Sequence, residues 1–282
     1  MSGLFVVTWG GMSSAGSSGL AVNEITVAFG GLTALDHVSL TADSGEIVGV
    51  IGPNGAGKTT LFNIICGFVR ADSGTLSYLG KNLGKHQPHH LAKLGIARTL
   101  QGVGLWKGLT VLENVMAGAA ARADFASALL GMWRSSREES RVRQRSLDLL
   151  EELGIAEFAE RYPTTLPYAI QKRVSLARAL IASPTLLLLD EPASGLSAPE
   201  LGELHDLIVG LRAKMGVLLV EHHMDLVMST SDRIVVLNFG RVIASGTPEQ
   251  IRTDPEVTTA YLGQDVAAVV PFPAPGGDGA RG

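Results

Sequence analysis

The sequence predicts an α/β protein in which a mixed β-sheet carries a phosphate-binding loop, and two observations support this expectation. A short apolar run, Glu46 to Ile51, leads through a glycine-rich turn into Lys58 to Ile65, whose pattern is helical. Further along, Thr185 to Asp190 and Gly216 to Glu221 are again short apolar runs, and both end in acids. Runs of this kind are typical of strands that are buried on both faces of a sheet.

The elements around these runs follow other patterns. Ala21 to Phe29 and Ala34 to Thr41 partly alternate apolar and polar residues, which predicts an antiparallel β subdomain. From about Thr110 to Ala182 the apolar residues recur at helical spacing, which predicts a helical subdomain. Ile234 to Leu237 and Arg241 to Ala244 flank a short turn, as the two strands of a hairpin do.

Both ends of the chain differ in composition from the rest. Residues 1–19 contain five Gly and five Ser and show no sustained period, so we expect a flexible extension. Seven of the last twelve residues are Pro or Gly, and we expect residues 264–282 to form a disordered tail. Residues 20–263 then form one folded domain, with its helical subdomain at about 102–182.

Composition and charge exclude several classes of protein. The net charge of −4 disfavours nucleic acid as a partner. No apolar run reaches the roughly 18 residues of a spanning helix, and no Lys or Arg precedes Lys58, so neither membrane crossing nor export is expected. The single cysteine, Cys66, cannot form an intramolecular disulfide; we interpret it as a core residue of a protein from a reducing compartment.

The glycine-rich turn matches a phosphate-binding pattern. It reads Gly, four residues, Gly-Lys-Thr, and it lies between an expected strand and an expected helix, which is the context that the pattern requires. Glycines let successive backbone N–H groups point at phosphate oxygens, and the helix start adds its positive dipole end. We therefore expect a P-loop NTPase core. The residues expected to bind the nucleotide phosphates are Gly52, Pro53, Asn54, Gly55, Ala56, Gly57, Lys58, Thr59 and Thr60.

Two adjacent acids supply what such a loop needs for hydrolysis. Asp190 and Glu191 follow four buried leucines, a costly place for carboxylates unless a cation is near. Asp190 is expected to hold Mg²⁺ together with the hydroxyl of Thr59. Glu191 is expected to polarise the hydrolytic water beside the γ-phosphate.

The order and spacing of these motifs resemble the ATP-binding subunits of ABC (ATP-binding cassette) transporters, over about Leu20 to Gly263. The resemblance implies the ABC ATPase fold, ATP as ligand, Mg²⁺ as cofactor and ATP hydrolysis as activity. It also implies roles for three further residues. Gln101 resembles the glutamine that senses the metal and the attacking water, His222 the switch histidine that contacts the γ-phosphate, and Phe29 the aromatic on which adenine stacks.

Leu166 to Leu180 occupies the place of the family's signature sequence, which contacts the nucleotide bound to the opposite subunit. The resemblance assigns this contact to Tyr168, Ala169 and Gln171. The segment departs from the usual signature at Pro167, Ala169 and Ile170, and we interpret it as weakened or specialised. Downstream, Ser197 stands where the family commonly has an aspartate along the dimer seam.

Three stretches, Phe29 to Leu35, Leu109 to Val115 and Asp254 to Gly263, resemble the importers of branched-chain amino acids. The resemblance implies a second ATPase subunit, as a homodimer or a paralogous heterodimer, and two transmembrane permease subunits. An extracytoplasmic solute-binding protein would act indirectly. It places the chain as a peripheral protein on the cytoplasmic face of the plasma (inner) membrane.

Other hypotheses remain open at this point. A related cassette for urea, amides or lipopolysaccharide would share many of these sequence stretches. Pro167, Ala169 and Ser197 would also fit an ATP-binding regulator with little hydrolysis. A soluble ABC-type ATPase without a transporter is disfavoured, because such proteins usually resemble two fused cassettes. A small-molecule kinase is weaker still, because no acceptor pocket follows the phosphate loop.

Overall fold

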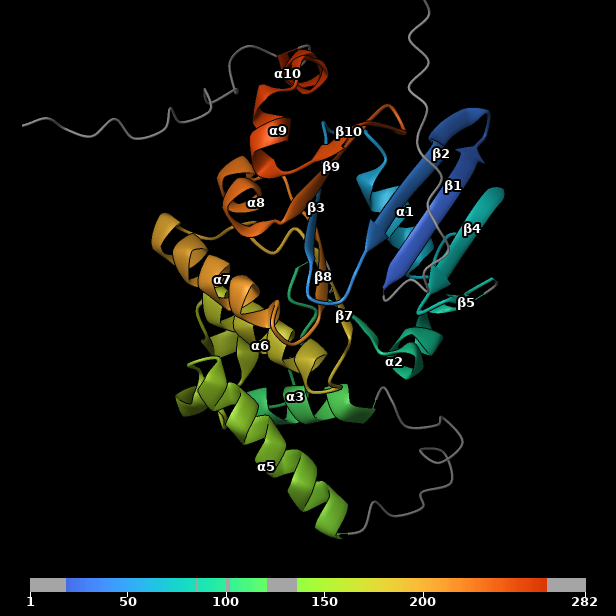
Figure 1. The fold of residues 1–282 in the computed structure, drawn as a ribbon. Helices are drawn as coiled ribbons and strands as arrows, with labels where there is room; N and C mark the ends of the chain where they lie inside the picture. The colour runs from blue at the N-terminus through green and yellow to red at the C-terminus, as the bar shows by residue number, and fades with distance from the viewer. Residues whose placement is uncertain (1–18, 85, 100–101, 121–135, 263–282) are drawn as a thin grey trace, which may run out of the picture.

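The fold consists of two β-sheets and the helices that pack on them (Figure 1). The computed structural model describes residues 19–84, 86–99, 102–120 and 136–262. The expected N-terminal extension, apart from Gly19, and the expected C-terminal tail lie outside the described residues. The boundaries expected for the helical subdomain stay a prediction.

The larger sheet has six strands in the order β10-β9-β3-β8-β7-β6. All neighbours pair in parallel except β9 and β10, which form the expected hairpin. The mixed sheet expected from the sequence is therefore confirmed. Its strands are β3 (Ile47–Ile51), β6 (Ile96–Arg98), β7 (Leu186–Asp190), β8 (Gly216–Val220), β9 (Arg233–Asn238) and β10 (Arg241–Gly246).

The smaller sheet is antiparallel, as the alternating pattern near the N-terminus predicts. Its order is β2-β1-β4-β5. The strands are β1 (Leu20–Phe29), β2 (Leu32–Ala42), β4 (Ser73–Tyr78) and β5 (Lys81–Asn82).

The helices gather in two places. Helices α3 (Val111–Ala120), α5 (Ser136–Glu152) and α6 (Tyr168–Leu180) lie together at one end of the molecule (Figure 1). Helices α8 (Met224–Thr230), α9 (Pro248–Thr253) and α10 (Pro255–Leu262) follow β8 to β10 at the other end. The remaining elements are α1 (Lys58–Ile65), α2 (Leu91–Leu94), α7 (Ala198–Leu211) and three short 3₁₀ turns, η1 (Pro88–His90), η2 (Ala156–Phe158) and η3 (Pro163–Thr165).

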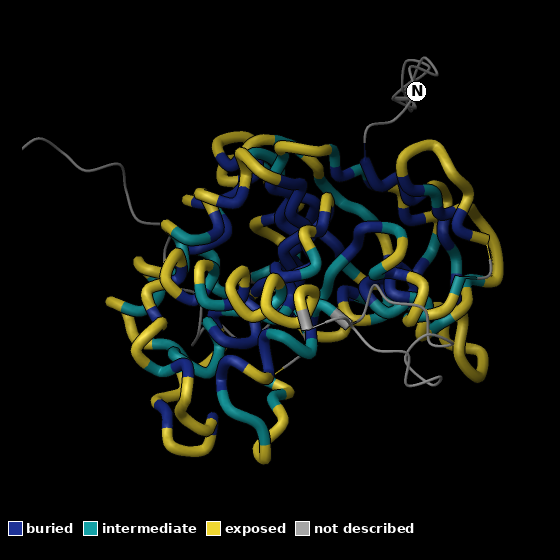
Figure 2. The backbone as a smooth tube through the Cα atoms, turned by 90° about the horizontal axis from the view of Figure 1, so that it is seen from below, coloured by how far each residue is buried: buried dark blue, intermediate teal, exposed yellow. Residues whose placement is uncertain are grey.

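The larger sheet separates two hydrophobic cores, because successive side chains of a strand point to opposite faces. Ile47 and Leu189 face the core that contains α3, α5, α6 and α7. Val48 and Leu188 face the core that contains α1 and the smaller sheet. Both faces are covered, which is why the sequence of these strands is apolar without alternation. Buried backbone accordingly runs through the middle of the molecule (Figure 2).

Within the described ranges, every helix is too short or too polar to cross a lipid bilayer. The buried position expected of the only cysteine is confirmed, because Cys66 directly follows α1 and is 0% exposed. Burial raises the pKa of its thiol to about 11.

We predict that Cys66 resists thiol-specific labelling at pH 8 in the folded protein. The thiol is both inaccessible and protonated there, since the reactive species is the thiolate. The labelling rate should rise to that of a free cysteine in denaturant, which serves as the control. Fast labelling under native conditions would contradict the packing around α1.

Candidate nucleotide-binding site

One edge of the larger sheet collects the loops that carry the predicted site. The strands β3, β8 and β7 are parallel, so their carboxyl ends meet at the same edge. Val50 pairs with Val220, and Val220 pairs with Asp190, so the three strands end in one row. The phosphate loop, the histidine pair and the two acids follow that row directly. Sequence positions about 170 residues apart are thereby neighbours.

The phosphate loop has a conformation that its glycines permit. Gly55 and Gly57 have φ angles of 81° and 102°, in the region that residues with a side chain rarely adopt. A Cβ atom at Gly57 would lie 2.7 Å from the carbonyl oxygen of Ala34. The turn of the β9–β10 hairpin supports the loop, because the Gly240 amide donates to the carbonyl of Ala56 at 3.0 Å.

Helix α10 also reaches the phosphate loop. The hydroxyl of Tyr261 is hydrogen-bonded to the backbone of Gly52, and burial raises the pKa of this phenol to about 12. Val257, on the same helix, is fully buried. The C-terminal part of the chain is therefore in contact with the first glycine of the loop.

Lys58 closes the phosphate loop on itself. Its Nζ donates to the carbonyls of Gly52 at 2.5 Å and Pro53 at 2.9 Å, and the residue is 9% exposed. Desolvation lowers the pKa of this ammonium group, and the negative charge of Glu191 partly restores it. The predicted lysine and the predicted catalytic acid thus interact electrostatically across the edge of the sheet.

Asp190 is paired with an arginine that the sequence reasoning missed. The Arg98 guanidinium donates to the carboxylate of Asp190 at 2.8 Å, and both side chains are largely buried. Arg98 also lies over the rings of Phe62 and Phe68, at 5.3 and 5.5 Å from their centroids. Arg98 is the only basic residue in the glutamine-loop stretch 95–101. Its isolated charge in that motif is the sequence signal that could have indicated a partner for Asp190.

The donor set at this edge fits a magnesium ion. Mg²⁺ prefers oxygen ligands, and Asp190 supplies a carboxylate at the end of β7 while Thr59 supplies a hydroxyl in the first turn of α1. Gln101, the third residue assigned to the metal, lies outside the described residues. Asp190 would have to share its charge between the metal and Arg98.

Glu191 directly follows β7, and His222 is the second residue after β8. Glu191 has a φ angle of 48°, and its amide continues the sheet by donating to the carbonyl of Val220 at 2.9 Å. The His222 side chain is 51% exposed, with its Nδ1 3.6 Å from a carboxylate oxygen of Glu221. Sequence reasoning treated Glu221 only as the end of an apolar run, yet it is fully buried and contacts both loops.

The residues expected to bind adenine and the opposite nucleotide lie farther out. Phe29 ends β1 and is 50% exposed, so its ring is open to a stacking partner. Tyr168 begins α6 beside the turn at Gly195, and Gln171 donates to the carbonyl of Leu166 at 2.9 Å. Ser197 is the N-cap of α7, where its amide donates to Glu200 in a capping box.

The phosphate loop, the acid pair and the histidine loop on neighbouring strand ends define the class of this protein as a P-loop ATPase with the ATP-binding cassette fold. Residues 35–194 match the family described as ABC transporter, and residues 241–267 match a second family described as branched-chain amino acid ATP-binding cassette transporter. The chain belongs to the ABC transporter family as an ATP-binding subunit, and it is an ATPase.

Relatives and solved structures agree with this assignment. The high-affinity branched-chain amino acid transport ATP-binding protein LivG of Salmonella typhimurium is 42% identical, over 87% of this chain and 98% of its own length. The corresponding protein BraF of Pseudomonas aeruginosa is also 42% identical over the same shares. A nucleotide-free ATP-binding cassette from an ABC transporter superposes with a TM-score of 0.76 at 30% identity, over 87% of this chain and 99% of its own.

The ligand state of another solved structure bears on the site. The ADP conformation of an ATP-binding cassette has a TM-score of 0.77 and 31% identity, with 87% of this chain and 99% of that chain covered. The ABC ATPase fold expected from the sequence is confirmed, and so is a nucleotide as its ligand.

We predict that Gly57→Ala abolishes high-affinity ATP binding. The left-handed backbone costs an alanine about 1–2 kcal/mol, and its Cβ would also collide with Ala34. Gly55→Ala is the matched control, because it carries the same backbone strain but has no atom within 4 Å of the new Cβ. Titration with a fluorescent ATP analogue should show the larger loss at Gly57; equal losses would contradict the close packing of the loop.

Proposed function

We propose that this chain powers the import of branched-chain amino acids. The observation that carries the proposal is 42% identity to importer subunits over 98% of their length, together with the match at residues 241–267. A lipopolysaccharide export ATP-binding protein of Haemophilus influenzae is 33% identical over a similar span, so the amino-acid importers are favoured. The cargo itself is chosen by permease and solute-binding subunits rather than by this chain.

We propose that hydrolysis takes place at the edge formed by β3, β8 and β7. Glu191 orients and polarises the water that attacks the γ-phosphate, and its position after a buried strand and its interaction with Lys58 support this role. His222 contacts the same phosphate from the neighbouring loop. Gln101 senses the metal and the attacking water. Asp190, Thr59 and Gln101 would hold Mg²⁺, which would supply neutralisation of the outer phosphates.

We propose that each ATP lies between two subunits, identical or paralogous. Adenine stacks on Phe29 of one subunit, and the start of α6 in the other faces the γ-phosphate. Pro167 is the N-cap of α6 and has no backbone N–H, so the donors come from the first helical residues, Tyr168 and Ala169. ATP therefore favours the closed dimer mainly through the dipole of α6. Direct hydrogen bonds to the γ-phosphate are fewer than a serine at position 167 would allow.

A groove between the segment 88–98 and helices α3 and α6 supports docking of a permease. It is lined by the 88–98 segment on one side and by α3 and α6 on the other, with the exposed aromatics Phe68 and Trp106 at its rim. The side chain of buried Asn114 fixes the turn that carries Trp106, because it accepts from the backbone amide of Trp106 and donates to the backbone carbonyl of Trp106. We propose that a short helix of a permease fills this groove and holds the chain at the cytoplasmic face of the plasma membrane.

We predict that Glu191→Gln keeps ATP affinity within about twofold but lowers turnover by about 100-fold or more, because the amide cannot accept a proton from water. Phosphate release and nucleotide binding by the purified subunit measure the two effects. The control is Glu203→Gln, which removes an exposed carboxylate paired with Arg173. Phosphate release at the wild-type rate would remove Glu191 from this role.

We predict that Trp106→Ala weakens association with the permease by about tenfold while the basal ATPase rate of the isolated subunit is unchanged. The ring is 52% exposed and stands over the guanidinium of Arg178, so its loss removes apolar contact area without disturbing the core. Tyr162→Ala, another exposed aromatic outside the groove, is the control. Co-purification with detergent-solubilised permease is the measurement, and equal recovery of both variants would argue against the groove.

A further inference from the structure

The turn that carries Glu191 has an unusual backbone, and the two side chains that hold it are not among the residues to which the sequence motifs assign a role. Glu191 has a φ angle of 48°, a left-handed conformation that is unfavourable for a residue with a side chain. Such a conformation persists only where surrounding contacts enforce it. Two charged side chains from different elements, Glu221 and Lys172, bind the backbone of residues 191–193.

Glu221 holds the turn from the side of the sheet. It directly follows β8 and is 0% exposed. One carboxylate oxygen accepts from the amide of Ala193 at 2.6 Å, and the other accepts from the amides of His222 at 2.8 Å and His223 at 3.1 Å. Only a carboxylate offers acceptors at both ends, because an amide group would direct its N–H₂ at one set of donors. Glu221 therefore joins the catalytic turn to the histidine loop.

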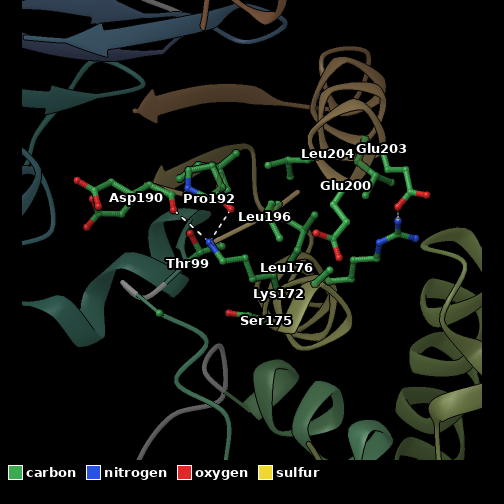
Figure 3. A pocket seen from close by; sticks show the side chains of 16 residues that line it. Thr99, Lys172, Ser175, Leu176, Asp190, Pro192, Leu196, Glu200, Glu203 and Leu204 are labelled. Carbon is green, nitrogen blue, oxygen red and sulfur yellow. Dashed lines mark hydrogen bonds and ion pairs between the residues drawn. The ribbon is translucent and has the colours of Figure 1, made fainter. Parts of the chain in front are cut away.

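Lys172 holds the same turn from the side of α6. Its Nζ donates to the carbonyl of Pro192 at 2.6 Å and to the carbonyl of Glu191 at 3.3 Å (Figure 3). Burial lowers the pKa of this ammonium group, and the charges of Glu221 and Glu191 oppose that shift. The ammonium also lies over the ring of Tyr168, 5.3 Å from its centroid. Lys172 thus links the signature helix directly to the turn within one subunit.

We propose that Lys172 and Glu221 are positioning residues for ATP hydrolysis, which fix the backbone of residues 191–193 so that the Glu191 side chain faces the attacking water. The inference rests on the role proposed above for Glu191. Because Lys172 belongs to α6, the position of that helix sets where the turn lies. Arrival of the opposite nucleotide at the start of α6 is thereby transmitted to Glu191 through one side chain.

The two residues act through the chemical step and not through nucleotide affinity. Neither belongs to the phosphate loop, and the polar contacts described above join them to backbone groups of the turn and the histidine loop. Loss of either contact should lower kcat and leave KM for ATP nearly unchanged. A role confined to stability would instead lower the fraction of active protein and would not separate lysine from arginine replacements.

The test compares Lys172→Met and Lys172→Arg in the full-length subunit. Methionine keeps the chain length but donates no hydrogen bond, so kcat should fall about tenfold or more with KM within about twofold. Arginine can donate to both carbonyls and should recover kcat to within about threefold of wild type. The matched control is Lys214→Met, which removes a half-exposed lysine paired with Glu152. A wild-type kcat for Lys172→Met, or no recovery with arginine, would overturn the proposal for Lys172.

Glu221→Gln tests the other contact, and circular dichroism and thermal unfolding report whether the variant folds. A folded variant should show the same separation of kcat from KM; a folded variant with wild-type kcat would overturn the role of Glu221. If Glu221→Gln does not fold, the Lys172 variants decide the proposal alone.

A double variant separates this inference from the assignment of Glu191. Adding Lys172→Met to Glu191→Gln should cause no further loss of kcat, since positioning matters only while the carboxylate is present. Multiplicative losses would contradict the proposal. If Glu191→Gln alone keeps full turnover, the proposed function fails. If Glu191→Gln is inactive while Lys172→Met is normal, only the positioning inference fails.

Discussion

The parallel pairing of β3, β8 and β7 is the constraint on which the site depends. Their pairing places Val50, Val220 and Asp190 in one row, so three loops emerge from the sheet side by side. Each strand is buried on both faces, and a shift of one residue would move its side chains into the opposite core. The two hydrophobic cores therefore fix the register, and the register fixes the distances between functional groups.

Charged groups at this edge are arranged in partly satisfied pairs. Lys58 bonds to carbonyls of its own loop, and Asp190 is neutralised by Arg98. Buried charges are costly without partners, so these contacts stabilise the site in this structure. A nucleotide and its metal offer new partners for the same groups. If Lys58 and Asp190 bind the nucleotide and its metal as proposed, contacts with the ligand replace these internal contacts.

The sequence was sufficient to predict the sheet and the positions of the phosphate loop and the two acids at strand ends, while the roles of these residues stay predictions. Those features depend on local patterns: apolar runs, glycine spacing and the residues directly after a strand. Arg98, Lys172 and Glu221 were missed because their roles arise from contacts between segments far apart in the chain. Lys172 of α6, for example, donates hydrogen bonds to residues about 20 positions away, in the turn after β7. The signature contacts and Gln101 stay predictions, because the first depend on a second subunit and the second lies outside the described residues.

The support of the phosphate loop by the β9–β10 hairpin and by Tyr261 of α10 has a consequence for how cassettes diverge. The C-terminal segment that matches the branched-chain amino acid family, residues 241–267, therefore contacts the phosphate loop, the element that defines the nucleotide site. Substitutions in this segment can change the affinity for ATP without changing any residue of the phosphate-binding motif. Specialisation for one transport system therefore need not be confined to the surface that meets the membrane partner.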